Sequence, residues 1–162
     1  MNLKELLSKL FTVCLDEEYG STEHITEHIN CDDLIEFTKN SNDDELKELG
    51  KLFKKLKKSY ENGDDNETVR EQLKRLTSPR KYELIDGIIN LVSSKQENLT
   101  VVNDYAVPRF KVNLKGKFSH CLVNIDYKSV WLFEEEDWPL DEDDYTEKDL
   151  EYVWEKIKES IE

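Results

Sequence analysis

Residues 110–133 read FKVNLKGKFSHCLVNIDYKSVWLF, and apolar and polar side chains alternate along most of this stretch. Every second residue from Phe110 to Leu114 is apolar, and the residues between them are lysine and asparagine. The alternation resumes at Cys121, and a short apolar run begins at Val130. A period of two places successive side chains on opposite faces of a β-strand. The stretch therefore predicts three strands that each bury one face.

The links between these strands are short and have the composition of turns. Gly116 interrupts the first link, and residues 126–129 (Asp-Tyr-Lys-Ser) form the second. Short links of this kind join antiparallel neighbours. We expect an antiparallel meander of three strands, or of four if residues 99–102 also pair with it.

The first 98 residues repeat their apolar side chains at the spacing of amphipathic α-helices rather than of strands. The clearest repeat has alternating steps of three and four and comprises Leu46, Leu49, Phe53, Leu56 and Tyr60. Such a narrow seam is typical of a helix that packs on other helices. Polar caps, glycines and Ser78-Pro79 divide the region into four or five helices, one of them short, at residues 21–28. We expect an N-terminal helical layer or small bundle.

The chain closes with one more helical pattern. Thr146 and Asp149 resemble a capping box, in which a carboxylate in the first turn bonds back to the cap. The apolar face that follows comprises Leu150, Val153, Trp154, Ile157 and Ile161. Helices segregated from strands indicate the α+β class, with the closing helix packed on the sheet. For 162 residues we expect one domain, with a helical portion at 1–98 and the sheet plus closing helix at 99–162.

The charge balance restricts the class of partner. The chain carries 37 acidic and 23 basic residues, which gives a formal net charge of −14. This charge disfavours DNA, RNA and anionic membranes, because phosphate contacts need clustered lysine and arginine. It favours a basic protein, whose approach is accelerated by electrostatic steering. No stretch reaches the ~18–20 apolar residues of a transmembrane helix, so we expect a cytoplasmic protein that contacts neither membrane nor nucleic acid directly.

Residues 134–149 are the most acidic part of the chain, and aromatic residues are set among the acids. Carboxylates attract a basic surface, and an aromatic side chain can anchor in a groove of the partner. On this basis we predict that a partner binds Glu135, Asp137, Trp138, Asp141, Asp143, Asp144 and Tyr145. In the alternative interpretation, Trp138 packs back on the sheet and the acids form a solvated loop.

A second charged cluster has the opposite sign. Five lysines lie between Lys51 and Lys58, in the second half of a predicted helix. The cluster has neither the interleaved arginines nor the exposed aromatics of a nucleic-acid surface. We interpret it as a solvated helix face, or as the counterpart of an acidic surface in the same molecule.

One group of residues has ligands suited to zinc. His24 and His28 stand four residues apart, so a helix would place them on one face, with Cys31 close beyond it. With Cys14 they would supply four ligands for a tetrahedral site. The spacing matches no standard finger or knuckle, and Cys14 lies in an apolar pattern typical of a core. We predict no cofactor and no metal, and retain a zinc-stabilised regulator as an alternative.

The sequence contains no glycine-rich phosphate loop, nucleophile elbow or HExxH motif, so we do not expect an enzyme. Small acidic inhibitors of nucleases, immunity proteins and viral anti-defence proteins share this composition as a class. Our first hypothesis is a protein of this kind, which neutralises a basic target such as a nuclease or toxin by protein–protein interaction. The main alternative is a structural scaffold that oligomerises through an exposed helix seam.

Overall fold

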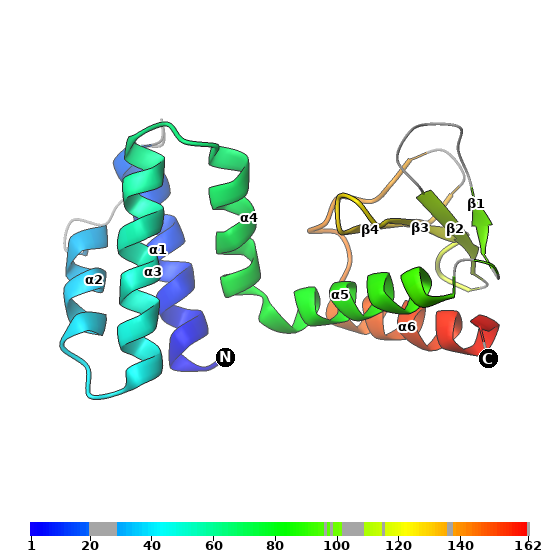
Figure 1. Cartoon of the computed structure of the whole chain (residues 1–162), viewed down its shortest axis with the longest axis horizontal. Coiled ribbons are helices and arrows are strands. Elements are labelled where there is room, and N and C mark those ends of the chain that lie inside the picture. Colours follow the sequence, from blue (N-terminus) through cyan, green and yellow to red (C-terminus); the bar gives the residue numbers. More distant parts are fainter. Residues whose placement is uncertain are drawn as a thin grey trace. The chain divides into compact units, whose positions relative to one another are not determined.

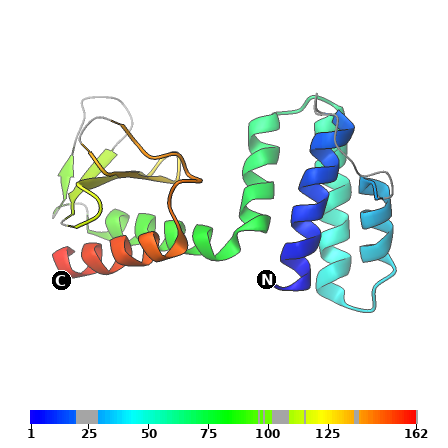
Figure 2. The same cartoon turned by 180° about the vertical axis from the view of Figure 1, so that it is seen from behind.

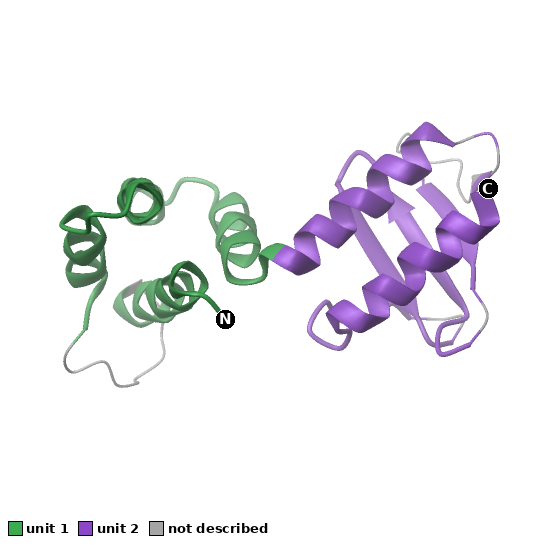
Figure 3. Cartoon of the chain, turned by 90° about the horizontal axis from the view of Figure 1, so that it is seen from below, with its two compact units in different colours: residues 1–79 green, residues 80–162 purple. Residues whose placement is uncertain are grey.

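The chain forms two compact units of different architecture. The computed structural model describes residues 1–19, 29–95, 97, 99–101, 109–114, 116–135 and 138–161. One unit comprises Met1–Pro79 and the other comprises Arg80–Glu162 (Figure 3). The described residues of the first unit form helices, and those of the second combine two helices with an antiparallel sheet. The chain therefore has the α+β fold that the sequence predicts.

The first unit, here called the helical unit, contains four helices in its described residues. They are α1 (Leu3–Tyr19), α2 (Cys31–Lys39), α3 (Asp44–Glu61) and α4 (Asn66–Thr77). The α3 helix lies beside α2, and α4 lies beside α1 (Figures 1 and 2). The short helix predicted at residues 21–28 falls outside the described residues.

Polar caps start the helices of this unit, as the sequence indicates. The Oδ1 atom of Asn2 accepts a hydrogen bond from the backbone N–H of Glu5 at 2.9 Å. Asn30 and Asp33 form a reciprocal capping box before α2, with bonds of 2.9 and 3.1 Å. Asp43 accepts backbone N–H groups from the first turn of α3, the closer at 2.8 Å. Each cap satisfies donors that the helix itself leaves without partners.

The helices of this unit enclose one apolar core. It comprises Leu7, Phe11, Cys14, Leu15, Cys31, Leu34, Leu46, Leu49, Phe53, Leu56, Val69 and Leu73. The rings of Phe11 and Phe53 stack at its centre, with centroids 4.2 Å apart and planes 3° from parallel. The seam predicted along α3 therefore packs inside the unit and is not exposed.

The α2 and α3 helices approach each other closely at Gly50. A Cβ atom at this position would lie 2.2 Å from the Oγ1 atom of Thr38 and 2.9 Å from its Cβ atom. Thr38 is fully buried, and its hydroxyl donates toward the carbonyls of Leu34 and Ile35, at 3.0 and 2.8 Å. The crossing of the two helices thus requires a residue without a side chain at position 50.

The second unit, here called the α+β unit, contains a sheet of four strands. The strands are β1 (Thr100–Val101), β2 (Arg109–Asn113), β3 (His120–Asn124) and β4 (Ser129–Phe133). They pair antiparallel in the order β1-β2-β3-β4, with Val112 opposite Cys121 and Val123 opposite Val130. The predicted meander is confirmed, and residues 100–101 supply its fourth strand.

Two helices, α5 (Pro79–Ser94) and α6 (Glu147–Ile161), cover one face of this sheet (Figure 3). The core between helices and sheet comprises Tyr82, Leu84, Ile85, Ile88, Ile89, Val92, Phe110, Val112, Leu114, Phe118, Cys121, Val123, Val130, Leu132, Tyr145, Leu150, Val153, Ile157 and Ile161. The closing helix packs on the sheet as expected from its apolar face.

The boundary between the units differs from the sequence prediction. We expected a helical portion of residues 1–98 within one domain, but α5 belongs to the α+β unit. Its buried face, which includes Ile85 and Ile88, packs in the core of the sheet rather than on the other helices. Gly87 brings α5 close to α6, because a Cβ there would lie 3.2 Å from the ring of Trp154. The boundary between the two compact units therefore falls at Pro79.

Some large apolar side chains remain at the surface of the described residues. Leu3, Leu6 and Val13 of α1 are each about half exposed. They recur along one side of the helix at steps of three and seven. Among the described residues, no helix combines the length and the apolar content that crossing a lipid bilayer requires.

Gly50→Ala should destabilise the helical unit, and the sign of the effect tests the close approach of α2 and α3. Overpacking a core typically lowers the free energy of unfolding by about 1–3 kcal/mol. Helix propensity alone would raise it by about 1 kcal/mol, because alanine replaces glycine inside a helix. Urea unfolding followed by circular dichroism measures the difference. The matched control Lys55→Ala, an exposed position on the same helix, should change stability by less than about 0.5 kcal/mol. A more stable Gly50→Ala variant would contradict the close approach.

Candidate partner-binding surface

Residues 134–149, here called the acidic segment, comprise the connection from β4 to α6 and the first residues of α6. In the described part of this segment, Glu135, Asp141, Asp143 and Asp144 are exposed to solvent. Asp137 lies outside the described residues. The exposed carboxylates predicted to bind a partner are thus brought to one connection on the surface of the α+β unit.

The acidic segment is held against the outer edge of β4. The backbone N–H of Leu140 donates to the carbonyl oxygen of Leu132 at 2.9 Å, on the side of β4 that faces away from β3. The backbone N–H of Asp144 donates to the carbonyl of Asp141 at 2.8 Å, which closes a turn. The acids therefore lie on backbone that is fixed by the sheet edge and by its own turn.

Tyr145 is buried in the core of the α+β unit, where its ring is 4% exposed. Its hydroxyl donates to the carbonyl of Val130 at 3.3 Å. Burial raises the pKa of this phenol, and the nearby carboxylate of Glu142 raises it further. The Nζ atom of Lys81 lies 4.3 Å from the centre of the ring and also bonds the Glu142 carbonyl. This placement corrects the prediction that Tyr145 inserts into a partner, since its ring already completes this core.

Trp138 has the opposite environment, because 82% of its surface is exposed. The alternative interpretation, in which this side chain packs back on the sheet, therefore does not hold for it. An indole ring offers a large apolar surface and one N–H donor, and it is among the side chains most often found at the centre of interfaces. Within the described part of the acidic segment, Trp138 is the aromatic side chain available to a partner.

Asp149 differs from the other acids because it has a structural role. Its Oδ2 atom accepts the backbone N–H of Thr146 at 2.8 Å, which is the capping interaction predicted from the sequence. Its Oδ1 atom bonds the Nζ atom of Lys117 at 3.1 Å, and its side chain is 13% exposed. Partial burial acts to raise the pKa of this carboxyl, but the hydrogen bonds from Thr146 and Lys117 outweigh it and lower the pKa.

The zinc alternative falls partly outside the described residues, which include neither His24 nor His28. Cys31 is fully buried, and its backbone N–H donates to the Oε1 atom of Glu18 at 3.0 Å. Cys14 is buried too, and its thiol donates to the carbonyl of Ile29 at 3.4 Å. Among the described residues, no group of three or more His, Cys, Asp or Glu side chains could hold a metal ion.

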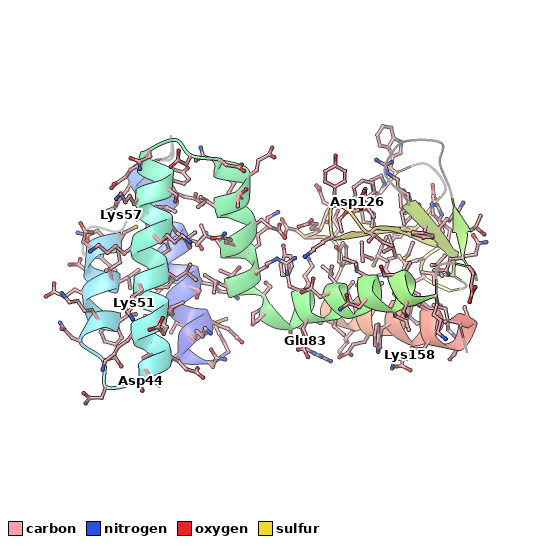
Figure 4. The ribbon with its side chains drawn as sticks, in the orientation of Figure 1. Asp44, Lys51, Lys57, Glu83, Asp126 and Lys158 are labelled. Carbon is pink, nitrogen blue, oxygen red and sulfur yellow. The ribbon has the colours of Figure 1, made fainter. Side chains whose placement is uncertain are left out.

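A groove of about 830 Å³ lies between α2 and α3 in the helical unit, and we call it the lysine groove. Its described lining includes six lysines and three carboxylates, namely Lys39, Lys47, Lys51, Lys54, Lys57, Lys58, Asp32, Glu36 and Glu61. Figure 4 shows Lys51 and Lys57 on α3, the helix that forms one wall of the groove. From the sequence, the lysine cluster is interpreted as a solvated helix face or as the counterpart of an acidic surface in the same molecule, and the groove that it lines was not predicted. The signal was the recurrence of lysine at steps of four, three and four from Lys47 to Lys58.

The chain was compared with protein-family models, with curated proteins and with solved structures. None of the three comparisons finds a match. The functional argument therefore depends on the residues of the chain itself.

Asp149→Asn should weaken the fold at neutral pH, and the effect should disappear in acid. Loss of the charged capping interaction typically lowers the free energy of unfolding by about 0.5–1 kcal/mol. Because the folded-state pKa of Asp149 is depressed, this stabilisation is complete above the unfolded-state pKa near ~4 and is lost as pH falls through the folded-state value. Urea unfolding at neutral pH and at about pH 2–3 tests this, with exposed Asp141→Asn as control. An Asp149→Asn difference that persists unchanged in acid would contradict the capping role.

The thiols should be unreactive in the native protein. Burial raises the pKa of both Cys31 and Cys121 to about 12, and the thiolate is the reactive form. Labelling with a chromogenic disulfide reagent at about pH 8, close to the pKa of a free cysteine, should be slow before unfolding and complete after it. Fast labelling of the native protein would show that these cores open readily.

Proposed function

We propose that the chain is a small acidic protein that neutralises a basic macromolecular target by binding it, without chemistry of its own. The target class is a basic protein such as a nuclease or a toxin, and the proposed role is that of an inhibitor, immunity or anti-defence protein. The observation that carries the proposal is the exposure of Trp138, an aromatic side chain that is 82% exposed and belongs to a segment with exposed carboxylates.

The charge of the acidic segment supports a basic partner. Asp141, Asp143 and Asp144 are exposed, and each can pair with a lysine or arginine of the target. Because the chain also has a net charge of −14, its field accelerates the approach of a cationic surface. The same field repels phosphate groups, which supports a protein rather than a nucleic acid as the direct partner.

The way the acidic segment is held also supports a binding role. At one end of the exposed stretch, the backbone N–H of Leu140 donates to the carbonyl of Leu132 in β4. At the other end, the side chain of Tyr145 is buried in the core. A held loop loses less conformational entropy on binding than a disordered one, so more of the contact energy remains as affinity. Trp138 precedes the held stretch and adds an exposed apolar anchor to this surface, which charges alone do not provide.

Charge reversal within the acidic segment should abolish recovery of the target. We expect the intact chain to co-purify a basic protein at about 0.15 M salt and less of it at about 0.5 M, because screening weakens the attraction. A variant carrying Asp141→Lys, Asp143→Lys and Asp144→Lys should recover at least about tenfold less, since three ion pairs become repulsions. Mass spectrometry identifies and quantifies the protein, and the purified target's own activity then reports inhibition.

A matched control separates the segment from the net charge. The variant with Asp64→Lys, Glu97→Lys and Asp126→Lys has the same total charge, and its substituted residues are exposed and lie outside the acidic segment. It should recover the target nearly as well as the unmodified chain. Equal losses in the two variants would show that net charge rather than the acidic segment matters. Failure of the unmodified chain to recover any basic protein would contradict the proposed function.

A scaffold that self-associates through α1 is the second candidate function. Leu3, Leu6 and Val13 favour it, because they form a half-exposed apolar row on that helix. An apolar contact of this kind strengthens or persists as salt is raised, whereas charge-driven contacts weaken. An oligomer of the purified chain that survives about 0.5 M salt would favour the scaffold.

A further inference from the structure

The lysine groove has an excess of positive charge on a strongly acidic protein. From Leu49 to Tyr60 the α3 helix contains five lysines and no acidic residue. The described lining of the groove has six lysines against three carboxylates. Lysines at this density repel one another, which costs stability unless an anionic group approaches them.

The lysines of the groove differ in whether they form ion pairs within the helical unit. Lys57 is 15% exposed and lies 2.9 Å from Asp32, 3.7 Å from Glu18 and 3.9 Å from Glu61. It therefore joins three segments of the helical unit and has a structural role. It also leaves the remaining lysines of the lining without those carboxylates as partners.

Three lysines of the groove are available to bind an anionic group. Among the described residues, Lys39, Lys54 and Lys58 have neither an ion pair nor a side-chain hydrogen bond. Lys51 has a partner at 2.6 Å in Glu48, but both side chains are about 70% exposed, so this pair contributes little stability. The groove thus presents free or weakly held ammonium groups from both α2 and α3.

The lining of the groove also includes residues without charge. Ile35 of α2 and Gly50 of α3 contribute to its lining, and the missing side chain at position 50 brings the two helices together there. An occupant that matches this lining needs carboxylates to pair with the lysines and an apolar group to contact Ile35. A nucleic acid is a poorer match, because the described lining contains no arginine and no aromatic side chain on which a base could stack.

We infer that the lysine groove binds the acidic segment of a second copy of this chain. The segment has the two properties that the groove requires: exposed carboxylates at Glu134, Glu135, Asp141, Asp143 and Asp144, and an exposed apolar ring at Trp138. Both halves of the contact are therefore present on every copy. The inference does not depend on a foreign target and is tested with the purified chain alone.

Because each copy offers one groove and one acidic segment, two copies can associate through this contact as a dimer. The net charge of −14 on each copy opposes this at long range, but salt screens that repulsion beyond about 8 Å at 0.15 M while contact pairs persist. In such a dimer the acidic segment is occupied, so a basic target has to displace the groove in order to bind.

Complementary charge reversal tests the inference. One variant reverses the groove with Lys51→Glu, Lys54→Glu and Lys58→Glu, and the other reverses the segment with Asp141→Lys, Asp143→Lys and Asp144→Lys. Sedimentation velocity should show the unmodified chain associating, each variant alone as a monomer, and an equimolar mixture associating again. Only the mixture restores opposite charges at both contacts. The control Lys9→Glu, Lys55→Glu and Lys95→Glu has the same charge as the groove variant, its changes lie outside the groove, and it should still associate.

A peptide probe gives a second measurement that needs no altered protein. A fluorescent peptide with the sequence of residues 134–149 should bind the unmodified chain and bind the groove variant at least about tenfold more weakly. The matched peptide, with every Asp and Glu replaced by its amide, should not bind. The inference is overturned if the unmodified chain is monomeric and does not bind the acidic peptide. Binding of an oligonucleotide in place of the peptide also overturns it, and would assign the groove to phosphate. Neither result bears on recovery of a basic target by the acidic segment.

Discussion

The open edge of β4 is the constraint on which the acidic surface depends. β4 ends the sheet, so the backbone carbonyls on its outer side need hydrogen-bond donors. An uncovered edge would also invite pairing with the strands of other chains. The acidic segment supplies these donors through the backbone of Leu140 and the hydroxyl of Tyr145. Between these two contacts, Asp141, Asp143 and Asp144 are exposed and Glu142 is half-buried. Covering the edge thus displays these acids, whereas Trp138 precedes Leu140 and is exposed independently of these two contacts.

Local patterns were sufficient to predict the elements of this fold. The period of two gave the three main strands, and short polar side chains before apolar repeats gave the helix starts, as at Asn2. The bond between Thr146 and Asp149 was predicted from their spacing. These features depend on residues at most four positions apart, so one sequence is enough to recognise them. Exposure of Asp141, Asp143 and Asp144 followed in the same way from their density, since so many carboxylates cannot all be buried.

Features that depend on tertiary packing were not predictable in the same way. Trp138 and Tyr145 stand in similar acidic surroundings in the sequence, yet only Tyr145 packs in the core of the α+β unit. The packing of α5 on the sheet was not predicted, because its apolar face fits a helix bundle or a sheet equally well. The lysine groove required knowledge that α2 lies beside α3, which follows from the contact between Gly50 and Thr38 rather than from the charges.

The charged residues of this chain include some that are paired within the fold and others that are exposed to solvent. Lys57 and Asp149 are largely buried and paired, so removing either leaves a partner unsatisfied. Lys54 and Asp143 are exposed, and their contribution to the fold is small because water solvates them well. Stability therefore gives no reason for gathering lysines along α3 and acids along the β4–α6 connection, since scattered charges would serve solubility equally well. Segregation of the two signs adds repulsion within each cluster, and a surface of opposite charge relieves that repulsion when it approaches. Both clusters are therefore better explained by binding than by folding.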